Sequence, residues 1–272
     1  MKKIVALGGG ENGRIRSDGT RKPYETYELD KEIVMLTEKD NPNFLFLGHA
    51  QSNEENELSY YETMRNIYGN IFGCNCDILT KNELINNIGV DEKLKWADII
   101  YEGGGDTLSL INLWKNTGFD KKLFNSWQAG KVMCGLSAGA NIWFSSCSSD
   151  ALKIQRNDMN APMINVDCLN FINLFLAPHC DEKNKYIDRL GHMKDSLKEL
   201  DMVGIGLSNC SALIIVDDKY KIIKSKNDRL EPFAIKCYWD KYEYIEQYLE
   251  FDKYESIDNL LSNKIKTYVK KD

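Results

Sequence analysis

Short apolar runs alternate with longer stretches of helical periodicity along the first half of the chain. The short runs predict buried strands at residues 3–7, 43–47, 76–79, 99–101 and 131–134. The longer stretches have apolar residues three and four positions apart and predict helices at residues 24–36, 57–68, 107–114 and 120–128. This alternation predicts an α/β fold, a mostly parallel sheet with helices on both faces, whose binding sites lie at the carboxyl ends of the strands.

The pattern changes after about residue 200. Residues 203–207, 212–216 and 220–224 are closely spaced strand candidates, and Asp217-Asp218 marks a turn, so we expect antiparallel edge strands on the same sheet. From residue 238 the chain is rich in Tyr, Glu and Lys, and this half-polar pattern predicts one or two surface helices. We therefore expect one α/β domain over residues 1–237 and a charged helical extension over residues 238–272 packed on it.

The composition narrows the class of protein and its partners. With 43% hydrophobic residues and a net charge of −6, the 272-residue chain is too apolar and too weakly charged for a disordered or collagen-like protein. Acidic residues are scattered and outnumber basic ones by 41 to 35, so we expect no nucleic acid partner. No apolar run approaches the roughly 18 residues of a membrane span, and residues 4–7 are too short a run for a signal peptide.

The eight cysteines indicate a reducing compartment rather than a disulfide framework, because a chain of this length can form a stable core without disulfide bonds. Only Cys74 and Cys76 lie close together, and no second pair stands at zinc-binding spacing. We therefore expect reduced thiols, a cytoplasmic location, no membrane partner and no bound metal.

The segment 132–144 has the clearest chemical signal. It runs from a predicted strand through a Gly-x-Ser-x-Gly pattern, Gly135 to Gly139, into a helical pattern, which is the arrangement of a nucleophile elbow. The chain nearly touches itself in such an elbow, so the residues two before and two after the serine must be small, although an ordinary tight turn can show the same pattern. Ser137 is the candidate nucleophile, and the Ala138 N–H at the start of the helix is a candidate oxyanion donor.

A serine nucleophile needs a base, and the chain contains three histidines. His179 follows an apolar run and Pro178, which places the imidazole at a strand end, and we expect it to be the base rather than a packed core residue. His49 also follows a strand and is a weaker candidate for a binding group. His192 lies in a charged helical pattern, which predicts a solvated surface residue.

Two acidic residues between Ser137 and His179 are candidates for the carboxylate that orients the base. Asp150 follows Ser148-Ser149, and Asp158 follows Asn157. Both are also typical turn residues, so the residues alone leave the choice open.

Two glycine-rich turns follow predicted strands. Residues 103–105 are three glycines before Asp106, which suits a tight turn with Asp106 as helix N-cap, or a close backbone approach to a ligand with a glycine N–H as second oxyanion donor. Residues 8–13 match the G-x-G-x-x-G pattern of dinucleotide-binding proteins. Residues 14–23 are polar and do not begin the helix that this motif requires, so we expect no nucleotide cofactor.

Four segments in order make the sequence resemble peptidase family S51, the family of dipeptidase E and cyanophycinase. They are GGGENGR, GGGDT, GLSAGANIWF with its downstream Ser-Asp, and CLNFINLFLAPHCDE, and the resemblance covers about residues 1–225. It implies a class I glutamine-amidotransferase-like fold, a three-layer α/β sandwich with antiparallel edge strands. It also implies a triad of Ser, His and Asp or Glu that cleaves amide bonds.

The resemblance transfers to this chain residue by residue. It implies Ser137 as nucleophile, His179 as base and Asp150 as acid, with Asp158 as second choice because residues 151–166 align loosely. The oxyanion neighbourhood corresponds to Gly104, Gly105 and Ala138.

The chain departs from the family pattern at two places that bear on specificity. Where relatives often carry acidic residues after the strand that ends near Leu207, this chain has Ser208-Asn209-Cys210. The basic pair often found after Pro-His-x-Asp is also missing. Specificity for an N-terminal aspartate is therefore not implied.

We expect a cytoplasmic serine peptidase that cleaves short peptides through an acyl-enzyme, without cofactor or metal. A homodimer is compatible with the sequence. The alternative is a catalytically degenerate α/β protein or one that binds a nucleotide or another small molecule. A lipase-like or esterase-like hydrolase fits less well, because its acid and histidine lie far downstream of the elbow and no histidine follows residue 192.

Overall fold

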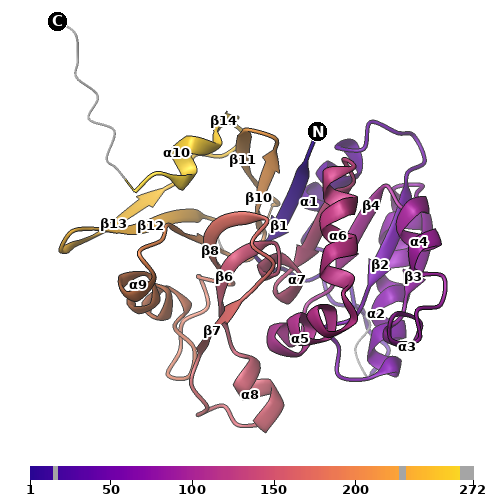
Figure 1. Ribbon diagram of the computed structural model, residues 1–272, viewed down its shortest axis with the longest axis horizontal. Coiled ribbons are helices and arrows are strands. Elements are labelled where there is room, and N and C mark those ends of the chain that lie inside the picture. The colour runs from indigo at the N-terminus through magenta and orange to yellow at the C-terminus, as the bar shows by residue number, and fades with distance from the viewer. Residues whose placement is uncertain (15–17, 227–230, 264–272) are drawn as a thin grey trace, which may run out of the picture.

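The computed structural model describes residues 1–14, 18–226 and 231–263, which form two β-sheets with helices packed on them (Figure 1). Within these ranges, the larger sheet has eight strands in the order β14-β11-β10-β1-β5-β4-β2-β3, and the smaller has six in the order β13-β12-β9-β8-β6-β7. The larger sheet contains β1 (Lys3–Leu7), β2 (Asn43–Leu47), β3 (Asn75–Leu79), β4 (Ile99–Glu102), β5 (Val132–Leu136), β10 (Ser211–Val216), β11 (Lys219–Lys224) and β14 (Glu255–Ser256). The smaller sheet contains β6 (Phe144–Ser149), β7 (Ile164–Asp167), β8 (Ile172–Pro178), β9 (Gly204–Leu207), β12 (Ala234–Asp240) and β13 (Glu243–Tyr248).

Helices cover both faces of the larger sheet and one face of the smaller sheet. They are α1 (Tyr27–Met35), α2 (Glu54–Arg65), the π-helical turn η1 (Asn66–Ile71), α3 (Lys81–Ile85), α4 (Val90–Trp96), α5 (Thr107–Thr117), α6 (Phe119–Gln128), α7 (Ala138–Asn141), α8 (Ala151–Arg156), α9 (Arg189–Leu200) and α10 (Ile257–Leu261). Alternate residues of β1 enter two cores: Val5 packs with α1 and α2, whereas Ile4 packs with α4, α5 and α6. The core on the Ile4 side continues into the smaller sheet, whose other face is covered by α9.

The central strands run parallel, and helices cover both of their faces, which accounts for the apolar sequence of β1 along its whole length. The fold class predicted from the sequence is confirmed, including the antiparallel edge strands β10 and β11. One detail is wrong: β9 does not join this edge but lies between β8 and β12 in the smaller sheet. None of the helices in the described ranges is long and apolar enough to cross a bilayer.

The helices predicted after residue 238 are also wrong. This part of the chain forms a hairpin of β12 and β13, then the two-residue strand β14 and the five-residue helix α10. The hairpin turn places Lys241 at φ +55°, without the Asn-Gly or Asp-Gly pair that identifies such a turn in a sequence. The division into residues 1–237 and 238–272 stays a prediction, and its boundary lies inside β12.

Candidate active site

Ser137 occupies a strained turn between β5 and α7, as the predicted strand-turn-helix context requires. Its backbone has φ +57° and ψ −111°, outside the regions that a serine normally adopts. The Ser137 N–H donates to the carbonyl of Leu7 at 3.2 Å, and the Ser137 carbonyl accepts from the N–H of Ala140 at 3.0 Å. Strain of this kind costs of order 1–3 kcal/mol and is concentrated at functional sites, where it holds a side chain in a fixed direction.

The two glycines of the elbow are required by close backbone contact. A Cβ atom at Gly135 would lie 2.6 Å from the carbonyl oxygen of Glu102. One at Gly139 would lie 2.9 Å from the carbonyl oxygen of Gly103 and closer still to that of Glu102. Any side chain at either position would therefore push β5 and α7 away from the end of β4, which is the steric demand expected of a nucleophile elbow.

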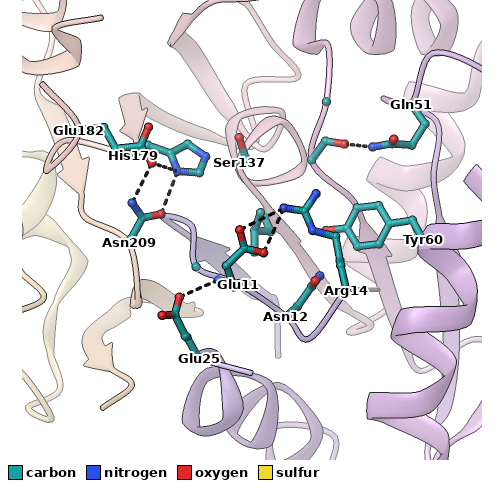
Figure 2. A pocket seen from close by; sticks show the side chains of 14 residues that line it. Glu11, Asn12, Arg14, Glu25, Gln51, Tyr60, Ser137, His179, Glu182 and Asn209 are labelled. Carbon is teal, nitrogen blue, oxygen red and sulfur yellow. Dashed lines mark hydrogen bonds and ion pairs between the residues drawn. The ribbon is translucent and has the colours of Figure 1, made fainter. Parts of the chain in front are cut away.

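The elbow opens into a cavity of about 510 Å³ at the carboxyl ends of strands from both sheets (Figure 2). The cavity is lined by Gly10, Glu11, Asn12, Arg14, Glu25, Gln51, Tyr60, Gly104, Gly105, Leu136, Ser137, His179, Glu182 and Asn209. Its charged groups are partly paired: Glu11 lies 3.1 Å from Arg14 and 2.6 Å from Lys22. Ser137 and His179 thus share one cavity with acidic, basic and amide side chains.

His179 follows the last residue of β8 and has an unusual backbone, with φ +138°. Its ring Nδ1 lies 3.1 Å from Oδ1 of Asn209, and Figure 2 shows the ring beside Ser137. No hydrogen bond within the described ranges joins the Ser137 hydroxyl to the ring. Burial lowers the pKa of the His179 imidazole, and the positive charge of Arg189 lowers it further, so the ring is held in its neutral form.

Asp150 lies at the N-cap of α8, and its carboxylate accepts from Nη2 of Arg189 at 3.0 Å. Arg189 is buried, with 6% of its side chain exposed, so this ion pair neutralises an interior charge. Asp150 makes no hydrogen bond to His179 within the described ranges, although its charge favours the protonated imidazole. Asp158 is exposed and accepts from the N–H of Asn160 at 2.9 Å, which is the turn role that the sequence also allowed.

The predicted oxyanion neighbourhood surrounds Ser137. Gly104 and Gly105 line the cavity, and a Cβ atom at Gly104 would lie 3.4 Å from Cβ of Ser137. Ala138 is the first residue of α7, where backbone N–H groups have no partner within the helix. Asp106 caps α5 by accepting from the N–H groups of Leu108 and Ser109, so the glycine turn also has its ordinary capping role.

The other two histidines lie outside the cavity. His49 is buried: its Nδ1 accepts from Trp114 Nε1 at 2.9 Å, and its Nε2 donates to the carbonyl of Leu79 at 2.7 Å. Burial lowers the pKa of His49 to about 4, so it is a neutral core residue. His192 is half-buried on α9, and its Nδ1 lies 2.9 Å from Ser148 Oγ, which corrects the prediction of a solvated side chain.

The first glycine-rich turn contributes to this cavity and does not have the dinucleotide-binding geometry. The described residues after Gly13 contain no helix until α1 begins at Tyr27, so no helix N-terminus follows the motif directly. A Cβ atom at Gly9 would lie 2.5 Å from Cε1 of His179 and closer to Oδ1 of Asn209. Among the described residues no cluster of His, Cys, Asp or Glu is placed to hold a metal ion.

Asn209 is the functional candidate that sequence reasoning missed. In the sequence it stands out only as a departure from an acidic pattern, yet it follows β9 at a strand end, which is also the signal that identifies His179. Parallel pairing aligns Pro178 with Leu207 at the ends of β8 and β9. The residues that follow these two strands therefore meet.

Comparisons with known proteins find similar sequences among peptidases. The model of peptidase family S51 matches residues 15–223. The chain is 28% identical over 190 residues to the uncharacterised peptidase YgaJ of Bacillus subtilis, covering 68% of this chain and 72% of that protein. It is 36% identical over 93 residues to the uncharacterised peptidase Lmo0363 of Listeria monocytogenes, covering 33% of this chain and 43% of that protein.

A solved structure shares the fold. The crystal structure of a peptidase from an acI-B1 actinobacterium superposes with a TM-score of 0.69 and 19% identity, covering 94% of this chain and 97% of that one. At this level of identity the likeness establishes the architecture alone. It supports the three-layer α/β sandwich that the family resemblance implies.

Proposed function

From the premise that the chain belongs to peptidase family S51 and is a serine-type peptidase, we propose that Ser137 is its nucleophile and His179 its general base. The observation that carries this proposal is the strained backbone of Ser137 at the mouth of the cavity that it shares with His179. An activated serine needs this combination of an exposed hydroxyl, a neutral imidazole and a strand-to-helix turn.

The proposed reaction proceeds through an acyl-enzyme. His179 removes the proton from the Ser137 hydroxyl as its oxygen attacks the scissile carbonyl carbon, and the imidazolium then gives that proton to the leaving amine. The backbone N–H groups of Ala138 and of Gly104 or Gly105 stabilise the negative oxygen of the tetrahedral intermediate. His179 then removes a proton from water as its oxygen attacks the ester carbonyl, and the imidazolium returns that proton to the Ser137 oxygen as the ester bond breaks and the acid product leaves.

For Asp150 we propose an electrostatic contribution to this reaction. Its carboxylate is paired with Arg189 and makes no hydrogen bond to the His179 ring within the described ranges. Its charge still favours the imidazolium that forms during the reaction. This is a smaller role than the orienting acid implied by the family resemblance.

We propose short peptides as substrates because of the size and lining of the cavity. A volume of about 510 Å³ lies within the range of small-ligand sites and holds only a few amino acid residues. Its lining offers Glu25 and Glu182 for an ammonium group and Arg14 for a carboxylate, which are the two charged ends of a short peptide.

Labelling and peptide cleavage together test the proposal. A fluorophosphonate probe is expected to label the wild type at Ser137, and a dipeptide and tripeptide library should reveal cleavage that Ser137→Ala reduces by about 10⁴-fold or more. Ser59→Ala is the matched control, since it removes an exposed hydroxyl from α2. A wild type that is neither labelled nor active on any library member would refute the assignment.

A further inference from the structure

A continuous chain of polar side chains lies behind His179 (Figure 2). Oδ1 of Asn209 lies 3.1 Å from the ring Nδ1, and Nδ2 of Asn209 donates to Oδ2 of Asp181 at 3.1 Å and to Oε1 of Glu182 at 3.0 Å. The backbone N–H of Asn209 also donates to Oδ1 of Asp181 at 2.8 Å. The amide is thus held on three sides between the ring and two carboxylates.

These contacts determine the donor and acceptor of each hydrogen bond among His179, Asn209 and the two carboxylates. Carboxylate oxygens only accept, so the NH₂ group of Asn209 must face Asp181 and Glu182, and its carbonyl oxygen must face His179. Since that oxygen also only accepts, Nδ1 of His179 must carry the proton. The other ring nitrogen, Nε2, then has a free lone pair, which is the tautomer that a general base requires.

We infer that Asn209 is the positioning residue of this active site, which holds His179 in its reactive tautomer and direction while Asp181 fixes the amide in turn. The inference rests on the proposed function, in which His179 is the base. Asn209 and not Asp150 contacts the ring Nδ1 among the described residues, and Oδ2 of Asp150 is instead paired with Arg189 at 3.0 Å. A neutral amide therefore has the place that serine hydrolases usually give to a carboxylate.

The neutral partner has a consequence for the charge of His179. An adjacent carboxylate on Nδ1 would favour the imidazolium strongly, whereas an amide oxygen favours it less. The charged groups around the ring are Arg189, which opposes protonation, and Glu182 and Asp150, which favour it. With burial added, the pKa of His179 is lowered, so the ionisation that limits activity in acid should lie below the ordinary histidine value of about 6.5.

Two variants test the inference, and both change the relay, that is, the hydrogen-bonded side chains of His179, Asn209 and Asp181. Asn209→Leu removes the acceptor and is expected to lower kcat by about 10²- to 10⁴-fold, a larger change than in KM, because the direction of the ring acts on the chemical step. The double variant Asn209→Asp with Asp181→Asn exchanges acid and amide, so the hydrogen bonds from residue 209 to His179 and to residue 181 can re-form with the charge now beside the ring, and only the bond to Glu182 is lost. Its kcat should stay within about tenfold of wild type, and the pKa of the acidic limb of its kcat/KM profile should rise by about one unit or more.

The controls separate this inference from the proposed function. Asn125→Leu, a matched change on the exposed side of α6, should retain the wild-type profile. If the wild type is labelled and active but Asn209→Leu keeps its kcat, or the exchange variant leaves the acidic limb unmoved, the inference is overturned while the serine mechanism stands. Lack of labelling in the wild type would instead overturn the proposed function. Should Asn209→Leu fail to fold, the shift in the exchange variant still decides the question.

Discussion

A methyl group added at Gly9 tests the contact between His179 and Asn209 without removing either side chain. Gly9 follows β1 and has φ +149°, and an ideal Cβ atom there would lie 2.5 Å from Cε1 of His179. The same atom would lie closer to Nδ1 of His179 and to Oδ1 of Asn209, whereas real Cβ atoms essentially never approach other atoms within 3.0 Å. In Gly9→Ala the ring and the amide must therefore move away from this turn.

The expected magnitude follows from this overlap and from the backbone angle. Displacing a catalytic group by about 1 Å typically costs on the order of 10²-fold in rate, so kcat of Gly9→Ala should fall by about 100-fold. The positive φ adds a folding cost of about 1–3 kcal/mol, because an alanine is strained in this region. The loss of rate per folded molecule is thus separate from the loss of stability.

The assay compares kcat on the best library peptide with the free energy of unfolding from urea titration. Gly118→Ala is the matched control, since Gly118 also has a positive φ of +70° but an added Cβ would meet nothing within 4 Å. It should lose about 1–2 kcal/mol of stability and keep its kcat. A folded Gly9→Ala protein with kcat within threefold of wild type would show that the ring and the amide are not pressed against this turn.

Three further predictions concern buried charge. Burial raises the pKa of the Glu102 carboxyl well above its ordinary value, so the folded protein must retain a proton that the unfolded chain releases as pH rises. Glu102→Gln should therefore gain stability relative to wild type between pH 5 and pH 8 in urea titrations, and a constant difference would contradict this. His49 makes stability depend on pH in the opposite direction. Because burial lowers its pKa to about 4, the free energy of unfolding of the wild type should fall by roughly 3 kcal/mol as the pH drops from 6.5 to 4, and His49→Gln should not show this fall. Asp150→Asn leaves the buried guanidinium of Arg189 without its partner and should lower the free energy of unfolding by about 3 kcal/mol, whereas an unchanged urea midpoint would show that the ion pair is not structural.

The first half of the fold could be predicted because its strands are buried on both faces. Such strands are continuous apolar runs between turn residues, as in β1 and β2. The strand β6 gives no such signal, since it is rich in serine although most of it is buried. Its hydroxyls find partners only in the folded chain, where Ser146 donates to the carbonyl of Val166 and Ser148 lies 2.9 Å from the ring of His192.

The candidate site also has one part that could be predicted from the sequence and one part that could not. Ser137 and its two glycines are recognisable because the steric demand of the elbow acts over five consecutive residues. Although both residues follow strand ends, the contact of His179 with Asn209 could not be predicted, because Asn209 lies thirty positions further along the chain. Their contact depends on the register of β8 and β9, which no local pattern specifies.

The two parts of the proposed catalytic pair are therefore positioned by different means. His179 and Asn209 follow neighbouring strands of the smaller sheet, so backbone pairing sets their contact. Ser137 follows β5 of the larger sheet, and its distance from the ring depends on how the two sheets pack. That packing is made by one continuous apolar core, in which Met133 of the larger sheet and Leu176 of the smaller are both fully buried. Because close-packed interiors transmit small changes in volume, a core substitution between the sheets can alter the approach of serine to base while the relay behind the base stays intact.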